Sequence, residues 1–392
     1  MSYWPQFKDT GNPLESASSH FGDIRRQLEI ALHVLRFPSP PTSAIASTAP
    51  LGHHETAMST PTENLATLVT EARNPASEHI DTLPTLDMLR LINDQDALVA
   101  AAVAAELPHI AAAVDAIADR FHQGGRLFYI GAGTSGRLGV LDASECPPTF
   151  SVPRTLVQGI IAGGDSALRT SSEATEDSTE QGIADLKTFH FGQPSTKETP
   201  DTPKSPGAPF IAVSPRWVGS NPLNPETTPD TLVGIAASGR TPYVLGALSH
   251  ARSLGALTIG LSCVPGSPIA KAADIAITPL VGPEVLTGSS RMKAGTATKL
   301  VLNMLSTGVM IKTGAVYGNL MVNVQPTNAK LVDRAQRIIM AATGCDQSTA
   351  AKLLTATGNV KTAIVMQKLN LDRPTAESRL ATALGSLAAA LS

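Results

Sequence analysis

Short apolar runs that alternate with helical patterns constrain the fold of this chain more than any other feature. The first run, 126–130, enters a glycine-rich turn and is typical of a buried strand. Strands and helices that alternate in this way form right-handed βαβ units, in which a parallel sheet is covered on both faces. The predicted strands are 126–130, 156–162, 231–237, 256–262 and 275–280. The predicted fold class is therefore α/β.

The remaining length divides by composition. Residues 1–63 are rich in proline and are predicted to form a disordered N-terminal extension, and 192–230 is a second proline-rich stretch, predicted to be an insertion or lid. Helices are predicted at 97–122, 167–187, 243–253 and 294–310, and then at 329–342, 346–355, 360–369 and 375–391. We therefore expect a catalytic domain over 64–327 and a small α-helical module over 328–392.

Composition excludes several function classes. The formal charge is -3 and aromatic residues make up 4%, which argues against nucleic acid as a partner. Three distant cysteines form neither a disulfide framework nor a zinc motif, and they favour a reducing compartment such as the cytoplasm. The longest apolar stretch, 97–118, carries Glu106, Pro108, His109 and Asp115, so it is predicted to be a core helix and not a membrane span.

The glycine-rich turn is suited to holding an anion. Gly131-x-Gly133-x-x-Gly136 matches a dinucleotide fingerprint, but the acidic residue expected about 20 residues later is absent. The alternative is a phosphate monoester held by backbone N–H groups at the helix N-terminus, with hydroxyl groups from Thr134 and Ser135. Because the loop 236–241 repeats this arrangement with Ser238 and Thr241, two such loops at one sheet edge favour a small polyol phosphate.

Acid–base capacity rests on two groups of carboxylates. Glu145 stands two residues before Pro147-Pro148, which are expected to end the helix, and the helix C-terminus would then raise its pKa and suit it to be a general acid. Glu173 and Glu176 are predicted to share one helical face, where a solvated cluster is the more common interpretation. Cys146 is interpreted as a buried thiol rather than a nucleophile, since no histidine is near in sequence.

Several long motifs resemble one known family. They are TEARNP (70–75), GAGTSGRLG (131–139), LDASECPPT (141–149), IAASGRTPY (235–243) and GPEVLTGSSRMKAGT (282–296). Together they look like the N-acetylmuramic acid 6-phosphate etherases, and the last is shared with glucokinase regulatory proteins. The resemblance implies a sugar-isomerase (SIS) domain with a five-stranded parallel sheet, a homodimer, and cleavage of the D-lactyl ether of N-acetylmuramic acid 6-phosphate without metal or cofactor.

The resemblance also implies residue roles. Glu145 matches the family's proton donor and Glu176 its second catalytic acid. The residues implied to bind the sugar phosphate are Gly133, Thr134, Ser135, Ser238, Gly239, Thr241, Glu284, Ser289, Ser290 and Lys293. The last four are equally compatible with capping and ordering the long helix that follows.

The sequence departs from the family pattern at Ser151, where a glycine is common, at Thr298 and at Pro326. The 192–230 insertion enters just before the strand of the second loop, from where it could crowd or cover the site. Two other functions are compatible with the same loops. One is a non-catalytic, sugar-phosphate-sensing regulator of a sugar kinase, and the other is an aldose–ketose isomerase, which would remove the same C2 proton without releasing lactate.

Overall fold

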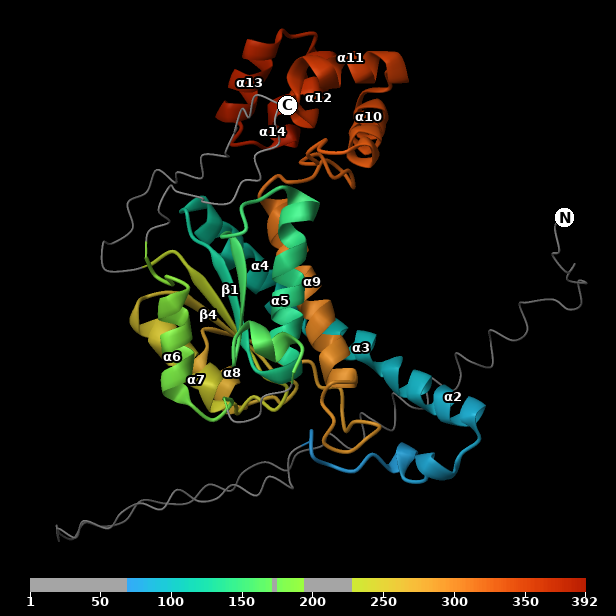
Figure 1. The fold of residues 1–392 in the computed structure, drawn as a ribbon, viewed down its shortest axis with the longest axis vertical. Helices are drawn as coiled ribbons and strands as arrows, with labels where there is room; N and C mark the ends of the chain where they lie inside the picture. Colours follow the sequence, from blue (N-terminus) through green and yellow to red (C-terminus); the bar gives the residue numbers. More distant parts are fainter. Residues whose placement is uncertain (1–68, 171–174, 194–227) are drawn as a thin grey trace, which may run out of the picture. The chain divides into compact units, whose positions relative to one another are not determined.

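Five parallel strands form the central sheet of the protein (Figure 1), seen here in a computed structural model that describes residues 69–170, 175–193 and 228–392. The strands are β1 Leu127–Gly131, β2 Val157–Ile161, β3 Thr231–Ile235, β4 Leu257–Leu261 and β5 Ile275–Ile277, in the spatial order β2-β1-β3-β4-β5. Gly131 pairs with Ile161 on one side and with Ile235 on the other, so neighbouring strands end in register. The predicted α/β class, the five strands and the parallel sheet are confirmed.

Helices cover both faces of the sheet. Alternate residues of β1 point to opposite faces of the sheet, as in any strand. Leu127 and Tyr129 therefore belong to one apolar cluster, and Phe128 and Ile130 belong to another. The first cluster is covered by α4 Leu107–His122, α5 Gly133–Phe150 and α9 Lys293–Lys312, and the second by α6 Thr179–Thr188, α7 Pro242–Ser253 and α8 Pro268–Ala272. Figure 1 shows these two layers on either side of β1 and β4.

The helix predicted over 97–122 is interrupted. The structure has α2 Thr85–Asp96, α3 Leu98–Ala105 and then α4, with the break at Glu106. Pro108 lies in the first turn of α4, where its missing N–H costs no intrahelical hydrogen bond, which explains why a new helix begins there. Within the described residues, no single helix has the length and apolarity of a membrane span, and 85–105 and 107–122 reach that standard only as a pair bent by 57°.

The prediction of one helix over 167–187 is wrong. A short 3-10 helix at Asp165–Leu168 follows β2, residues 175–177 form a turn, and α6 begins only after Ser178, whose side chain accepts from the Gln181 N–H. The Ser178 hydroxyl oxygen pairs with a backbone N–H that would otherwise bond within a longer helix, so the serine starts a new helix and does not continue an earlier one. Glu176 therefore lies on a turn and not on a helical face, and Glu173 lies outside the described residues.

The expected end of α5 before Pro147-Pro148 is also wrong. Both prolines lie inside α5, which continues to Phe150. They occupy the last turn, so their missing N–H groups deprive only the carbonyls of Ala143 and Ser144 of an intrahelical donor, and few residues follow whose helical conformation they could disturb. The helix ends at Ser151, which has the left-handed conformation (φ 53°) and donates its N–H to Pro147 O at 2.9 Å.

We expect the substitution Ser151→Gly to stabilise the protein by about 1 kcal/mol, because glycine adopts the left-handed C-cap without the steric cost that serine bears. Thermal unfolding checks this as a raised midpoint. Asn370 ends the helix α12 (Val360–Leu369) in the same conformation (φ 50°), and asparagine tolerates it, so Asn370→Gly should change the midpoint less. Equal shifts for the two variants would contradict the explanation.

The C-terminal region is wholly helical, as predicted. Its helices are α10 Ala329–Thr343, α11 Gln347–Thr357, α12 Val360–Leu369, α13 Arg373–Thr382 and α14 Leu387–Leu391, around an apolar cluster of their own. The predicted helix over 375–391 is two helices, because Leu384 and Gly385 both take positive φ between them. The division of the chain at 327/328 stays a prediction, since residues 63–392 form one compact unit.

The two ends of the proline-rich insertion meet at the amino edge of the sheet, where the strands begin. Arg126 and Asp230 form a buried ion pair there, with Nη2 and Oδ2 2.6 Å apart. Arg126 also donates to His190 O and Gln193 O, and Asp230 accepts from the Gly192 N–H. Both ends are thus fixed at the edge opposite the two hydroxyl-bearing loops. Residues 194–227 lie outside the described residues, so the predicted lid stays a prediction.

Candidate active site

The glycine-rich loop joins β1 to α5 at the carboxyl edge of the sheet. α5 begins at Gly133, and its N-cap residue, Ala132, has no polar side chain with which to cap the helix. Thr134 and Ser135 are half-buried residues of its first turn. The N–H groups at a helix N-terminus attract an anion, and these two hydroxyl groups can add hydrogen bonds. The loop is therefore suited to hold a phosphate group.

Two of its glycines are required by the backbone. Gly133 has φ +52°, which other residues adopt at a cost. A side chain on Gly136 would bring its Cβ to 2.5 Å from the Gly131 carbonyl oxygen, so only glycine lets α5 start this close to β1. The glycine pattern thus serves a close strand-to-helix turn, and it does not by itself indicate a dinucleotide.

Glu176 lies between the two hydroxyl-bearing loops. Its Oε1 is 3.4 Å from the point where a Cβ on Gly133 would stand, so its carboxylate reaches the first loop. Its carbonyl oxygen accepts a hydrogen bond from the Tyr243 N–H at 3.1 Å, in the first turn of α7, whose N-cap residue is Thr241. The structure therefore brings together Glu176, Gly133 and Thr241.

The second loop follows β3 and carries Ser238 and Gly239. The Gly239 N–H donates to Ala236 O, and the Gly239 carbonyl accepts from the Ile269 N–H of α8, each at 2.9 Å. Gly239 has φ +68°, and a Cβ there would lie 2.2 Å from Ser267 Oγ. Close packing on α8 thus fixes the shape of this loop, while Ser238 and Thr241 remain half-buried at the sheet edge.

A third loop, before α9, closes on the same edge. The Glu284 side chain is buried and accepts from the N–H groups of Lys293 and Ala294, each at 2.9 Å, so it caps α9. Lys293 Nζ donates to Gln95 Oε1 at 3.0 Å, and burial lowers the pKa of this lysine despite the nearby carboxylate of Glu284. The sequence left two interpretations open for Glu284 and Lys293, namely substrate binding and ordering of the helix. Their contacts in the structure favour the second.

Ser290 belongs to that loop and lies near the first one. A Cβ on Gly295 would stand 3.6 Å from Thr134 Cγ2 and 3.7 Å from Ser290 O. Ser289 and Ser290 are half-buried. The start of α9 therefore packs beside the start of α5, with Ser290 and Thr134 at the same end of this helix pair.

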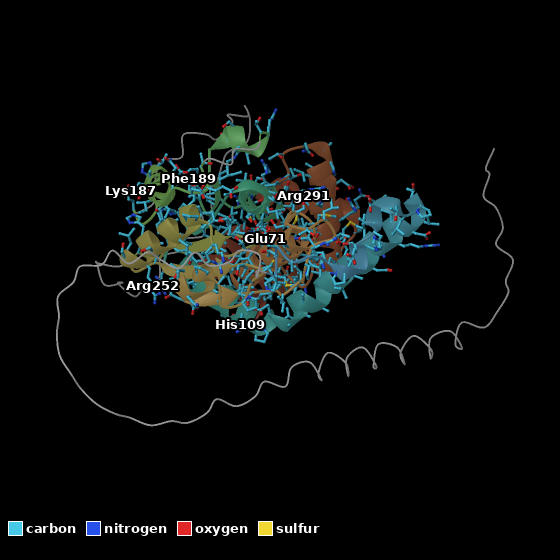
Figure 2. All side chains as sticks on the ribbon, turned by 90° about the horizontal axis from the view of Figure 1, so that it is seen from below. Glu71, His109, Lys187, Phe189, Arg252 and Arg291 are labelled. Atoms are coloured by element: carbon cyan, nitrogen blue, oxygen red, sulfur yellow. The ribbon has the colours of Figure 1, made fainter. Side chains whose placement is uncertain are left out.

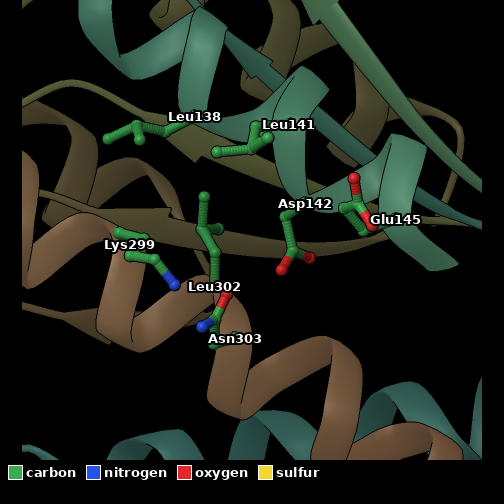
Figure 3. Close-up of a pocket in the computed structure, with 7 residues that line it drawn as sticks. All are labelled: Leu138, Leu141, Asp142, Glu145, Lys299, Leu302 and Asn303. Carbon is green, nitrogen blue, oxygen red and sulfur yellow. The ribbon is translucent and has the colours of Figure 1, made fainter. Parts of the chain in front are cut away.

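Glu145 is exposed and lies elsewhere, beside a cavity of about 360 Å³ between α5 and α9 (Figure 3). The cavity is lined by Leu138, Leu141, Asp142, Glu145, Lys299, Leu302 and Asn303. Figure 3 shows Asp142, Lys299 and Asn303 pointing toward one another across the gap. The two glutamates that the sequence predicted to be catalytic are therefore not neighbours within one chain.

Asp142 is held by hydroxyl groups at the back of this cavity. It accepts from Tyr129 Oη at 2.9 Å and from Ser306 Oγ at 3.1 Å. Burial raises the pKa of the Asp142 carboxyl, although both hydrogen bonds act in the opposite direction. Sequence reasoning gave Asp142, Lys299 and Asn303 no role. The sequence signal that could have identified them is helical spacing. Asp142 and Glu145 are three residues apart and share a face of α5, and Lys299, Asn303 and Ser306 share a face of α9 in the same way.

The predicted inertness of Cys146 is consistent with its surroundings. Its thiol is buried, and burial, followed by the charge of Asp142, raises its pKa to about 12. Such a thiol is protonated at neutral pH and a poor nucleophile. Among the described residues, no group of three His, Cys, Asp or Glu side chains is arranged to hold a metal ion.

A five-stranded parallel sheet with hydroxyl-bearing loops at its carboxyl edge defines an α/β protein of the SIS class. Family models agree: residues 109–212 match the glucokinase regulatory protein N-terminal SIS domain, and residues 220–308 match the SIS domain. Among solved structures, "E. coli CFT073 c3406 in complex with A5P" covers 58% of this chain and 92% of its own at 16% identity and a TM-score of 0.36.

Curated relatives define the family more narrowly. N-acetylmuramic acid 6-phosphate etherase of Aeromonas hydrophila is 53% identical over 83% of this chain and 97% of its own. The etherase of Photorhabdus laumondii is 54% identical over 77% of this chain and 89% of its own. Etherase 1 of Vibrio cholerae is 52% identical over 84% of this chain and 98% of its own. The chain belongs to the N-acetylmuramic acid 6-phosphate etherase family, which confirms the resemblance. The regulator and isomerase interpretations are not favoured.

Proposed function

We propose that the protein is a carbon–oxygen lyase that cleaves the D-lactyl ether of N-acetylmuramic acid 6-phosphate to give N-acetylglucosamine 6-phosphate and D-lactate. The observation that carries the proposal is the position of Glu176 between two hydroxyl-bearing loops, in a chain about half identical to etherases over most of its length. A carboxylate beside a phosphate-holding turn can act on the sugar whose phosphate that turn holds.

The chemistry needs an acid and a base. In the open-chain sugar the aldehyde acidifies the C2 proton, which a base removes, while an acid protonates the ether oxygen at C3 as lactate departs. Water then adds to the unsaturated aldehyde at C3, so the hydroxyl group of the product comes from water. Glu145 and Glu176 supply the two carboxyl groups, and each such group contributes roughly 10²–10⁴-fold to the rate.

Substrate recognition follows from the loops. The α5 N-terminus with Gly133, Thr134 and Ser135 would hold the 6-phosphate, and Ser238, Gly239 and Thr241 would contact the sugar. Ser289 and Ser290 would complete the rim, since Ser290 and Thr134 both lie beside Gly295 at the start of α9. Glu284 and Lys293 act through the position of α9, because their polar atoms already pair with protein groups.

We further propose a homodimer that acts in the cytoplasm. The three cysteines are free thiols, two of them buried, in agreement with a reducing compartment. Leucines on α2 and α3 are exposed, among them Leu86, Leu89 and Leu98, as expected of helices that pack against a second chain. Light scattering checks the dimer, and a mass near that of one chain, 40.7 kDa, would contradict it.

A lactate assay tests the activity. The protein is incubated with N-acetylmuramic acid 6-phosphate, and D-lactate is measured enzymatically with time. We expect release by the wild type and roughly 10²–10⁴-fold slower release by Glu145→Gln. Ser144→Ala, an exposed change on the same helical turn, is the matched control and should keep the wild-type rate. If the wild type releases D-lactate no faster than Glu145→Gln, the assigned activity is wrong. Conversion of the sugar without release of lactate would indicate an isomerase.

A further inference from the structure

The TEARNP motif at 70–75 takes no part in the proposed reaction, yet buried polar side chains fasten this segment to the loop before α9. Asn74 Nδ2 donates to Pro283 O at 3.1 Å. Ser77 Oγ, at the end of the same segment, donates to Val285 O at 2.8 Å. Both residues are 7% exposed, so the loss of either bond would leave buried polar groups unpaired. The segment and the loop therefore hold each other in place.

Gln95, at the end of α2, ties the motif to α9 as well. Its Oε1 atom accepts from Asn74 Nδ2 at 2.8 Å and from Lys293 Nζ at 3.0 Å. Lys293 is the first residue of α9, and its N–H donates to the buried carboxylate of Glu284. The position of the motif relative to the start of α9 is thus fixed by side chains.

Glu71 of this motif extends its carboxylate to the loop before α9. Its Oε2 is 3.2 Å from the point where a Cβ on Gly288 would stand, directly before the serine pair 289–290. Within the described residues, no hydrogen bond or ion pair holds this carboxylate. Arg73, two residues later, pairs instead with Glu78 at 3.6 Å. Glu71 is therefore an acceptor without a partner on the serine-bearing loop.

Glu71 lies on the face where the sugar phosphate is proposed to bind. α9 starts at its lower end in Figure 1, and Figure 2 looks at the molecule from below. Glu71 appears near the middle of this view, while Lys187 and Arg252 appear toward its periphery. Thr134 of the first loop packs beside the same start of α9, at Gly295. Glu71 and the proposed phosphate site therefore share one face of the molecule.

We propose that Glu71 determines specificity at this site, because its carboxylate accepts hydrogen bonds from the sugar hydroxyl groups next to the phosphate. The proposal rests on the proposed function. An ionised carboxylate accepts hydrogen bonds but donates none, and it repels the phosphate and the lactyl carboxylate. The open-chain substrate carries hydroxyl donors at C4 and C5, between the phosphate at C6 and the ether at C3. These are the groups that a carboxylate beside the phosphate loop can select.

The buried contacts of the motif explain how one exposed side chain can select a ligand. A carboxylate on a freely moving segment would lose conformational entropy each time a ligand bound, whereas the segment fastened by Asn74 and Ser77 has lost most of that freedom on folding. Hydrogen bonds to a charged acceptor are also stronger than those between neutral groups. The carboxylate of Glu71 is thus placed before the sugar arrives.

Ligand binding to the whole chain tests the proposal, with N-acetylglucosamine 6-phosphate and inorganic phosphate as probes in isothermal titration calorimetry. We expect Glu71→Ala to bind N-acetylglucosamine 6-phosphate about 10–100-fold more weakly, as befits a lost hydrogen bond to a charged group. Its affinity for inorganic phosphate should be unchanged or higher, because one negative charge near the phosphate site is gone. Glu71→Gln keeps a neutral acceptor and should lose less. Glu78→Ala, which removes an exposed acid close by, is the matched control and should bind both ligands as the wild type does.

Binding of inorganic phosphate also shows that the variant is folded. Equal weakening of both ligands in Glu71→Ala would overturn the proposal, since Glu71 would then only shape the loop. Unchanged binding of both would overturn it as well. In the lactate assay of the same variant, KM should rise by a similar factor while kcat changes little.

The role of Glu71 and the proposed reaction fail separately. If the wild type releases lactate and Glu71→Ala binds the sugar phosphate normally, only the role of Glu71 is wrong. If the wild type releases no lactate but Glu71→Ala still weakens N-acetylglucosamine 6-phosphate selectively, the reaction is wrong and the sugar-binding role stands. A wild type that neither binds nor converts the sugar overturns both.

Discussion

The substitution Glu176→Gln is expected to lower kcat for lactate release by roughly 10²–10⁴-fold while the fold is kept. Glutamine matches glutamate in shape but cannot accept or donate the proton. The backbone of Glu176 keeps its hydrogen bond to the Tyr243 N–H, so the turn and the start of α7 are not disturbed. Phosphate recognition depends on the loop at Gly133 and Thr134, so KM should change much less than kcat. Steady-state kinetics measures kcat and KM, and far-UV circular dichroism checks that the fold is kept.

The neighbouring acid provides the control for this variant. Asp177 is exposed on the same turn, and Asp177→Asn removes one negative charge at nearly the same place. We expect it to retain the wild-type kcat. A similar loss in both variants would mean that local charge, and not the carboxyl group of Glu176, controls the rate. Loss of binding alone in Glu176→Gln would make Glu176 a recognition residue.

The central sheet could be predicted from the sequence because its strands are short and mostly apolar, and the central ones are buried on both faces. β1 and β3 are fully buried over their five residues, and β2 and β4 are mostly buried. Each of these four strands starts within one residue of its predicted position. The loops after β1 and β3 were found by their glycines and hydroxyl groups. Parallel strands that end in register then necessarily bring both loops to one edge.

The separation of the two acids could not be predicted, because it depends on how far α5 continues. Pro147 and Pro148 indicate a helix end, yet the helix tolerates them in its last turn and ends at a left-handed Ser151. Motif resemblance identified Glu145 and Glu176 but carries no distance between them. The cavity beside Glu145 is likewise non-local, since its walls come from α5 and α9, more than 150 residues apart in the chain.

Glu176 shows a second limit of sequence reasoning. The segment around it is rich in acidic residues, which favours a helix. Ser178, however, accepts a hydrogen bond from the Gln181 N–H and is the N-cap of α6, so the helix begins only after Ser178 and Glu176 lies on a turn. That turn is what allows the carboxylate to reach Gly133. Local propensity predicted the wrong element here, and the departure coincides with the proposed site, where local rules are most often broken.

Loss of Asp230 is expected to have the largest effect on stability. The Arg126–Asp230 pair is almost fully buried, with side chains 9% and 3% exposed, and Asp230 also accepts the Arg126 and Gly192 N–H groups. Asp230→Ala leaves the buried guanidinium without its counter-charge and these backbone donors without their acceptor, which should cost about 3–5 kcal/mol of unfolding free energy. Urea denaturation measures the loss. The pair lies at the edge opposite the loops, so the remaining folded protein should keep its kcat.

An exposed pair of the same type makes the comparison decisive. Arg337 and Asp333 on α10 approach to 2.7 Å, close to the 2.6 Å of the buried pair, but their side chains are 66% and 55% exposed. Asp333→Ala should therefore cost only about 0.2–1 kcal/mol, because solvent screens the charges. Replacing both buried partners, in Arg126→Met with Asp230→Leu, should cost less than Asp230→Ala alone, since no charge is left unpaired. If Asp230→Ala and Asp333→Ala proved equally mild, the buried pair would not be what fixes the ends of the insertion to the sheet.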